Sequence, residues 1–105
     1  MSIAKGIALI TGSAQGIGRG TALRLAKDGF DIALNDLPSK YDQLRTVASE
    51  IENMGRRTHV VPADVTIEDD VKRMVRSVVE KLGGLDVVSA LVLLHSQRTC
   101  PYCTA

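Results

Sequence analysis

Short apolar runs alternate along the chain with segments in which apolar residues recur at helical spacing. The runs suit strands that are buried on both faces, and the spaced residues form one apolar stripe along a helix. The predicted strands are Gly6–Thr11, Asp31–Asn35, His59–Val61 and Leu85–Val88. The predicted helices are Ile17 to Asp28, a second helix with its apolar stripe from Leu44 to Met54, and a third with its stripe from Val71 to Leu82.

Polar residues and glycines mark where these helices begin and end. Ser39 with Asp42, and Thr66 with Asp69, have the spacing of a capping box, in which two side chains satisfy backbone N–H groups at a helix start. Glycine follows each helical stripe, at Gly29, Gly55 and Gly83–Gly84, and is suited to end a helix. We therefore expect capping boxes on the second and third helices.

The order of elements, strand and helix in alternation, predicts an α/β fold. Parallel strands need crossover connections, and those crossovers are right-handed, so we predict a doubly wound parallel sheet in the order 3-2-1-4. The first two helices then cover one face and the third covers the other alone. The pattern stops after Val88, so we assign residues 1–88 to a partial domain of about four strands and residues 89–105 to an atypical tail, whose disorder is left open.

A glycine-rich segment lies between the first strand and the first helix. Gly12 permits a sharp turn, Gly16 leaves room for a diphosphate, and Gly18 lets the helix pack closely. The helix start offers N–H groups and partial positive charge to an anion. The predicted dinucleotide-binding residues of this segment are Gly12, Ser13, Gln15, Gly16, Ile17 and Gly18.

Asp36 follows the second strand at about the distance of a ribose-binding acid, ~20 residues beyond the glycines. Its carboxylate can accept hydrogen bonds from both ribose hydroxyls and would repel a 2′-phosphate. Gln15 and Leu37 bring no compensating positive charge, and Arg19 lies inside the helix. These residues favour NAD over NADP, the alternative being a solvated loop acid.

The segment Thr11-Gly12-x-x-x-Gly16-Ile17-Gly18 resembles the short-chain dehydrogenases/reductases, and the resemblance extends through Asp36 and Ala63-Asp64-Val65 to Leu85-Asp86-Val87-Val88. It implies a Rossmann-like fold and an oxidoreductase that transfers hydride between NAD(H) and a small alcohol or ketone. Asp64 and Val65 inherit by position the role of contacting adenine.

The sequence departs from this family after the fourth strand. Ser89-Ala90-Leu91-Val92 stands where the family has an Asn-Ala-Gly stretch, and the catalytic serine and the Tyr-x-x-x-Lys pair are absent. Tyr41-x-x-x-Arg45 has the catalytic spacing, but it opens the helix on the adenosine side, and arginine does not replace the family lysine. We therefore assign no catalytic residue and expect this chain alone to be inactive.

Composition restricts the remaining functions. A formal net charge of +1 gives no basic footprint for nucleic acid, and the absence of a long apolar run or signal-peptide pattern favours a cytoplasmic protein that does not bind membranes. Cys100 and Cys103, with His95, have the spacing of a redox or zinc site, but a zinc site needs a fourth ligand, so we assign no metal.

Three interpretations of function stay open. The first is an incomplete oxidoreductase whose small carbonyl or alcohol substrate binds only to a complete version. The second is an NAD-binding module without turnover, and the third is a redox or zinc-binding tail. In each case a short sheet leaves an apolar edge through which chains can self-associate.

Overall fold

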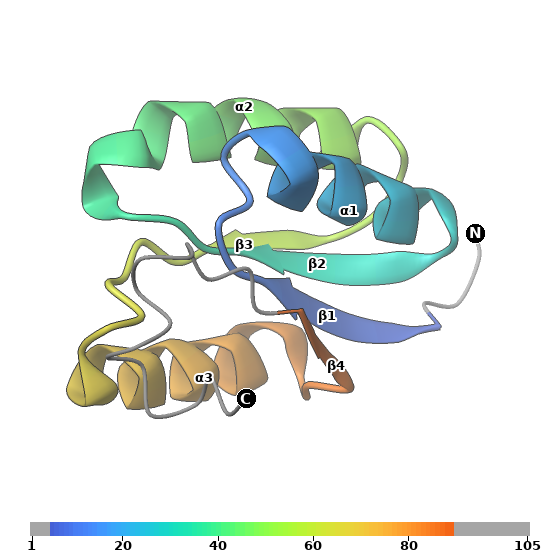
Figure 1. The fold of residues 1–105 in the computed structure, drawn as a ribbon. Coiled ribbons are helices and arrows are strands. Elements are labelled where there is room, and N and C mark those ends of the chain that lie inside the picture. The colour runs from blue at the N-terminus through green and yellow to red at the C-terminus, as the bar shows by residue number, and fades with distance from the viewer. Residues whose placement is uncertain (1–4, 90–105) are drawn as a thin grey trace.

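The computed structural model describes residues 5–89, which form a parallel sheet between two layers of helices (Figure 1). The strands are β1 (Gly6–Ile10), β2 (Phe30–Leu34), β3 (Thr58–Val60) and β4 (Val87–Ser89). The helices are α1 (Gly16–Lys27), the 3₁₀ helix η1 (Pro38–Lys40), α2 (Tyr41–Glu52) and α3 (Glu68–Leu82). The expected alternation of strands and helices is confirmed, with most boundaries shifted by one or two residues.

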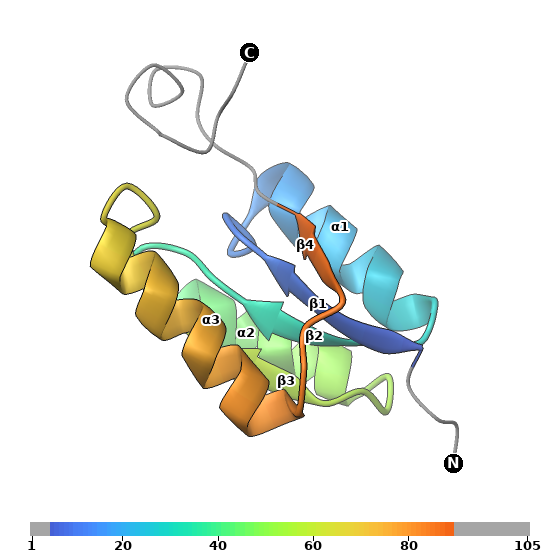
Figure 2. The same ribbon diagram turned by 90° about the horizontal axis from the view of Figure 1, so that it is seen from below.

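The sheet has the predicted order, β3-β2-β1-β4, and every neighbouring pair is parallel (Figure 2). β1 and β2 are in register along their whole length, from Gly6 opposite Phe30 to Ile10 opposite Leu34. The carboxyl ends of these two central strands therefore lie side by side, and the loops that follow them begin at one edge of the sheet.

Two apolar clusters cover the two faces of the sheet, as the sequence predicted. On one face α1 and α2 pack against alternate residues of β1 and β2, including Ile10 and Leu34. On the other face α3 packs alone, with Met74, Val78 and Leu82 against Leu9 and Ala33. This alternation along each central strand is what a sheet covered on both faces requires.

The capping-box prediction is wrong for both helices. Pro38 opens the 3₁₀ turn η1, so the N-cap of α2 is Lys40, one residue after the expected Ser39. The N-cap of α3 is Ile67, and Thr66 instead donates its hydroxyl to the Asp64 carboxylate at 2.6 Å. Neither helix has a side-chain cap, because η1 displaces one candidate and a neighbouring carboxylate takes the other.

Arg57 connects the sheet to α3 through a buried acid on β2. Asp31 on β2 is buried, and its carboxylate accepts hydrogen bonds from the Arg57 main-chain N–H at 3.0 Å and from Nε at 2.9 Å. The Arg57 guanidinium also donates to the carbonyl oxygen of Leu82 at 3.1 Å. Arg57 thus joins β2 to the end of α3, while most of its side chain stays exposed.

Apolar side chains are exposed on the edge strand β4 and on α3, as expected for a short sheet: Val87 is 37%, Val88 is 57% and Val79 is 44% exposed. Self-association through this edge stays a prediction, which sedimentation at increasing protein concentration tests.

Within residues 5–89 no helix is long and apolar enough to cross a membrane. Cys100, Cys103 and His95, to which no metal was assigned, and residues 90–105 of the predicted tail lie outside the described residues.

Candidate functional site

The glycine loop that joins β1 to α1 turns where the sequence predicts. Gly12 and Gly16 both have positive φ angles, 64° and 62°, a conformation that side-chain-bearing residues rarely adopt. A Cβ atom on Gly16 would meet nothing within 4 Å, so the space beside it is open. The loop therefore leaves its main chain accessible at Gly16, as an approaching diphosphate requires.

Gly18 makes the closest approach in the loop. A Cβ atom built at this position would lie 2.1 Å from the carbonyl oxygen of Gly12 and 2.7 Å from its carbonyl carbon. The sequence predicted a close contact of this helix with the sheet, but the contact that excludes a side chain is with the loop itself. The start of α1 thus folds back onto the turn that leads into it.

Ser13 ties the loop to the end of β2. Its side chain is fully buried, and its hydroxyl donates to the carbonyl oxygen of Asn35 at 3.1 Å, while its main-chain N–H donates to the same oxygen at 2.9 Å. In return the Asn35 main-chain N–H approaches the Ser13 hydroxyl at 3.0 Å. This geometry fixes the loop through Ser13, and a direct contact of Ser13 with a cofactor stays a prediction.

Asp36 lies against the glycine loop. Its Oδ2 accepts a hydrogen bond from the main-chain N–H of Ala14 at 3.2 Å, and its Oδ1 accepts one from Leu37 at 2.8 Å. The side chain is partly exposed. The two predicted elements, a phosphate cradle and an acid for a ribose, are therefore adjacent in space although more than a helix and a strand separate them in sequence.

The segment with Asp64 and Val65 reaches the same edge of the sheet. The main-chain N–H of Ala63 donates to the Asp36 carbonyl oxygen at 3.0 Å, which sets this segment beside the end of β2. Thr66 donates to the Asp64 carboxylate from its hydroxyl and from its main-chain N–H, and these two bonds hold the pKa of Asp64 below its ordinary value. Val65 is partly buried against the cluster beneath α3.

The remaining loop residues leave their side chains outside. Gln15 is exposed and is the N-cap of α1, and Ile17 is 77% exposed. The first turn of α1 has no acidic side chain, so no acid of the helix itself neutralises the partial positive charge of its start. The loop and the helix start can therefore receive an anion.

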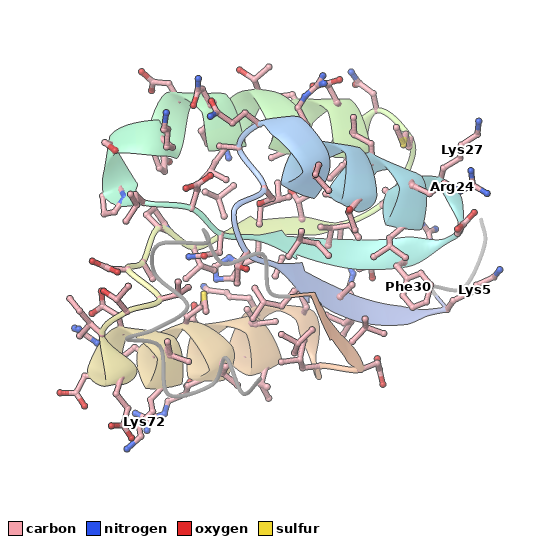
Figure 3. All side chains as sticks on the ribbon, viewed as in Figure 1. Lys5, Arg24, Lys27, Phe30 and Lys72 are labelled. Atoms are coloured by element: carbon pink, nitrogen blue, oxygen red, sulfur yellow. The ribbon has the colours of Figure 1, made fainter. Side chains whose placement is uncertain are left out.

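Arg19 beside the glycine loop is paired with an acid, and three other basic side chains lie at the far end of the sheet. Arg19 donates from one guanidinium nitrogen to both carboxylate oxygens of Glu50 on α2, each at 2.7 Å. Figure 3 shows Lys5, Arg24 and Lys27 at the end of the sheet where β1 and β2 begin, opposite to the glycine loop. Arg24 and Lys27 lie in the last turn of α1, where they oppose the negative end of its dipole.

Sequence reasoning missed Asn35, which is 1% exposed. Its side-chain Nδ2 donates to the carbonyl oxygens of Val61 at 2.9 Å and Ala63 at 3.3 Å. The sequence offered one indication, an amide side chain at the end of an otherwise apolar strand. A polar group that is buried there needs hydrogen-bond partners.

Two weaker candidates gain no support from the described part of the chain. Tyr41 is the first residue of α2, and it and Arg45 are exposed. Between Lys5 and Ser89, no group of three or more His, Cys, Asp or Glu residues is arranged to hold a metal ion.

Comparisons with known proteins match this chain to dehydrogenases and reductases. A sequence model described as short chain dehydrogenase matches residues 6–94. A short-chain dehydrogenase/reductase of Hericium erinaceus is 52% identical over 89 residues, which are 83% of this chain and 35% of that protein. An L-2,3-butanediol dehydrogenase of Corynebacterium glutamicum is 43% identical over 82 residues, 78% of this chain and 32% of that protein.

A solved structure supports the same assignment. The crystal structure of a dehydrogenase/reductase from Sinorhizobium meliloti 1021 matches with a TM-score of 0.77 and 37% sequence identity, over 83% of this chain and 34% of that one. The chain thus spans about a third of the length of these relatives. On its fold, its glycine loop and these matches, the chain belongs to the short-chain dehydrogenase/reductase family.

Proposed function

We propose that the described residues bind NAD. The main chain from Gly12 to Gly18 and the start of α1 hold the pyrophosphate, Asp36 binds the adenosine ribose, and Asp64 with Val65 borders the adenine. The observation that carries the proposal is the Asp36 carboxylate at 3.2 Å from the main-chain nitrogen of Ala14, inside the glycine loop. The positive φ of Gly16 and the open space beside it fit a diphosphate.

Charge supports NAD over NADP. A 2′-phosphate beside Asp36 would face a carboxylate at close range, which is unfavourable unless a cation compensates. Arg19, the basic residue that directly follows Gly18, already pairs with Glu50. NAD meets no such repulsion, because its ribose hydroxyls can donate hydrogen bonds to the Asp36 carboxylate.

In a longer version of the chain, the reaction would be reversible hydride transfer between NAD(H) and a small alcohol or ketone. Relatives named L-2,3-butanediol dehydrogenase and 3-oxoacyl-[acyl-carrier-protein] reductase support this class. We propose that the 105-residue chain alone gives no turnover, because its sequence has no Tyr-x-x-x-Lys pair. The same absence favours a second candidate, a module that binds NAD without catalysis. A cytoplasmic location is also a proposal.

Thermal unfolding with NAD and with NADP tests the binding proposal. At about 100 times its Kd a ligand adds roughly 2.7 kcal/mol of stability, which raises Tm by several degrees in a domain of this size. We expect a clear rise with NAD and a much smaller one with NADP. In Asp36→Asn the preference for NAD should weaken, because the charge that repels the 2′-phosphate is gone.

Asp42→Asn is the matched control, since Asp42 is an exposed acid in the first turn of α2. It should keep the preference for NAD. Equal stabilisation of the parent by both nucleotides would reject the role of Asp36, and no shift with either would reject dinucleotide binding. Assays of alcohol oxidation with the 105-residue chain test the proposed lack of turnover, because NAD-dependent oxidation by this chain would reject both that part of the proposal and the purely binding module.

A further inference from the structure

We propose that Asn35 is a positioning residue for the adenosine half of the nucleotide site. Its buried side chain sets the segment with Asp64 and Val65 against the end of β2, where Asp36 meets the glycine loop. This inference rests on the proposed function, and it assigns a role to a residue that no predicted contact with the nucleotide involves.

The side chain of Asn35 bonds to one segment through both of its donors. Nδ2 donates to the carbonyl oxygens of Val61 at 2.9 Å and Ala63 at 3.3 Å, on either side of Pro62. This segment leads directly into Asp64 and Val65. The amide therefore fixes two points of the main chain that immediately precede the predicted adenine contacts.

The main chain of Asn35 bonds to two further segments. Its N–H donates to the carbonyl oxygen of Ile10 at 3.0 Å and lies 3.0 Å from the Ser13 hydroxyl, and its carbonyl oxygen accepts from Ser13. The next residue is Asp36. One buried residue thus joins the end of β1, the glycine loop and the segment after β3, and these segments together with Asp36 carry all the predicted nucleotide contacts.

The chemistry of position 35 explains why an amide stands there. At 1% exposure no bulk water replaces a lost donor, so an apolar side chain would leave the two carbonyl oxygens without their amide partner. Aspartate has nearly the same shape but no donor when ionised, and it would oppose two carbonyl oxygens with a negative charge. Asparagine satisfies both oxygens without a charge.

The test measures NAD and ADP binding to the 105-residue chain by calorimetry, in the parent and in Asn35→Ala. We expect about a tenfold loss of affinity for NAD and a similar loss for ADP, because the adenosine end alone is displaced. Leu82→Ala is the control. Leu82 is buried at the end of α3, roughly 20 Å along that helix from Glu68, so its loss destabilises the fold without moving the site.

Asn35→Asp gives a second readout that a general loss of stability does not produce. The buried carboxyl can donate only when protonated, so lowering the pH from about 7.5 to about 5 should reduce the ratio of its Kd to that of the parent. Asp36 and Asp64 are present in both proteins, and the ratio removes most of their shared effect. The corresponding ratio for Leu82→Ala should stay level.

The outcomes separate the inference from the function on which it rests. If the parent binds NAD and Asn35→Ala loses no more affinity than Leu82→Ala, the positioning role is refuted while NAD binding stands. If Asn35→Ala does not fold, the pH dependence of Asn35→Asp decides, and a level ratio refutes the role. A parent that binds neither NAD nor ADP refutes the proposed function and the inference with it.

Discussion

Replacing Gly18 by alanine adds one methyl group at the closest approach in the glycine loop. The new Cβ would lie 2.1 Å from the carbonyl oxygen of Gly12 and 3.1 Å from the Cα atom of Ser13. These are main-chain atoms, so no side-chain rotation relieves the overlap. To restore a separation of 3.0 Å, α1 and the loop must move apart by about 0.9 Å.

The size of the effect follows from two opposing terms. Overpacking of this kind costs about 1–3 kcal/mol, and more where the surroundings cannot yield. Alanine in place of glycine within a helix returns up to about 1 kcal/mol. We therefore expect Gly18→Ala to lose roughly 1–2 kcal/mol, which lowers Tm by about 4–8 °C for each kcal/mol in a domain of this size.

Gly20→Ala is the matched control, because it makes the same chemical change in the same helix. A Cβ atom at Gly20 would meet nothing within 4 Å. Only the helix-forming term then acts, and the variant should gain up to about 1 kcal/mol. The stability of both variants is measured from the helical circular dichroism signal, followed during heating and during urea unfolding. The expected result is a stability change of opposite sign at positions two residues apart.

Two results would refute this reasoning. If Gly18→Ala is as stable as the parent, the start of α1 is not held against Gly12 as described. If both variants lose the same stability, the loss comes from the helix and not from the contact. Binding of NAD adds a further check, because displacement of the loop should weaken it in Gly18→Ala while Gly20→Ala keeps the parent affinity.

Two further predictions concern ionisable side chains. Arg57→Ala removes the guanidinium from the buried Asp31, so it should cost about 1–3 kcal/mol in urea unfolding. Arg24→Ala, whose pair with Asp28 is exposed, should change stability by less than about 0.5 kcal/mol, and equal losses would contradict the distinction. Burial, and then Lys81, lower the pKa of His59, so the unfolded chain gains this proton first as pH falls, and stability declines below about pH 6.5. His59→Gln should flatten that decline, and parallel stability curves would count against it.

Most of the fold could be predicted from the sequence because its main determinants are local and repeated. Apolar runs such as Gly6–Ile10 define strands, and the glycines at positive φ after the helices, Gly29, Gly55 and Gly83, mark the stops. Right-handed crossovers then leave few sheet orders, and the observed one is among them.

The side-chain caps of α2 and α3 were not predictable in the same way. A capping box is a pattern of residue types, but whether it forms depends on which hydrogen bond each side chain finds. The 3₁₀ turn beginning at Pro38 moves the start of α2 beyond Ser39, and the Asp64 carboxylate takes the hydroxyl of Thr66. Both competing features are visible in the sequence, but their relative strength is set by the folded geometry.

The candidate site likewise contains residues that a local sequence pattern reveals and residues that it does not. The glycines and Asp36 were found because their spacing reflects a turn and a strand end. Asn35 and the Arg57–Asp31 pair were not found, because their partners lie more than twenty residues away and meet them only across the sheet. Contacts of this kind follow from the register of β2 with β3, which no local pattern specifies.

The contacts that build the candidate nucleotide site come from β1, β2 and the segments that follow β1, β2 and β3. None of the contacts described for it involves β4, which pairs with β1 through three residue pairs against five between β1 and β2. Loss of β4 pairing would therefore leave the glycine loop, Asp36 and Asp64 tied together. Under the proposed function, the residues that contact the nucleotide lie between Gly12 and Val65, and none of them belongs to a Tyr-x-x-x-Lys pair. Nucleotide binding by this chain can therefore be tested without an assay of turnover.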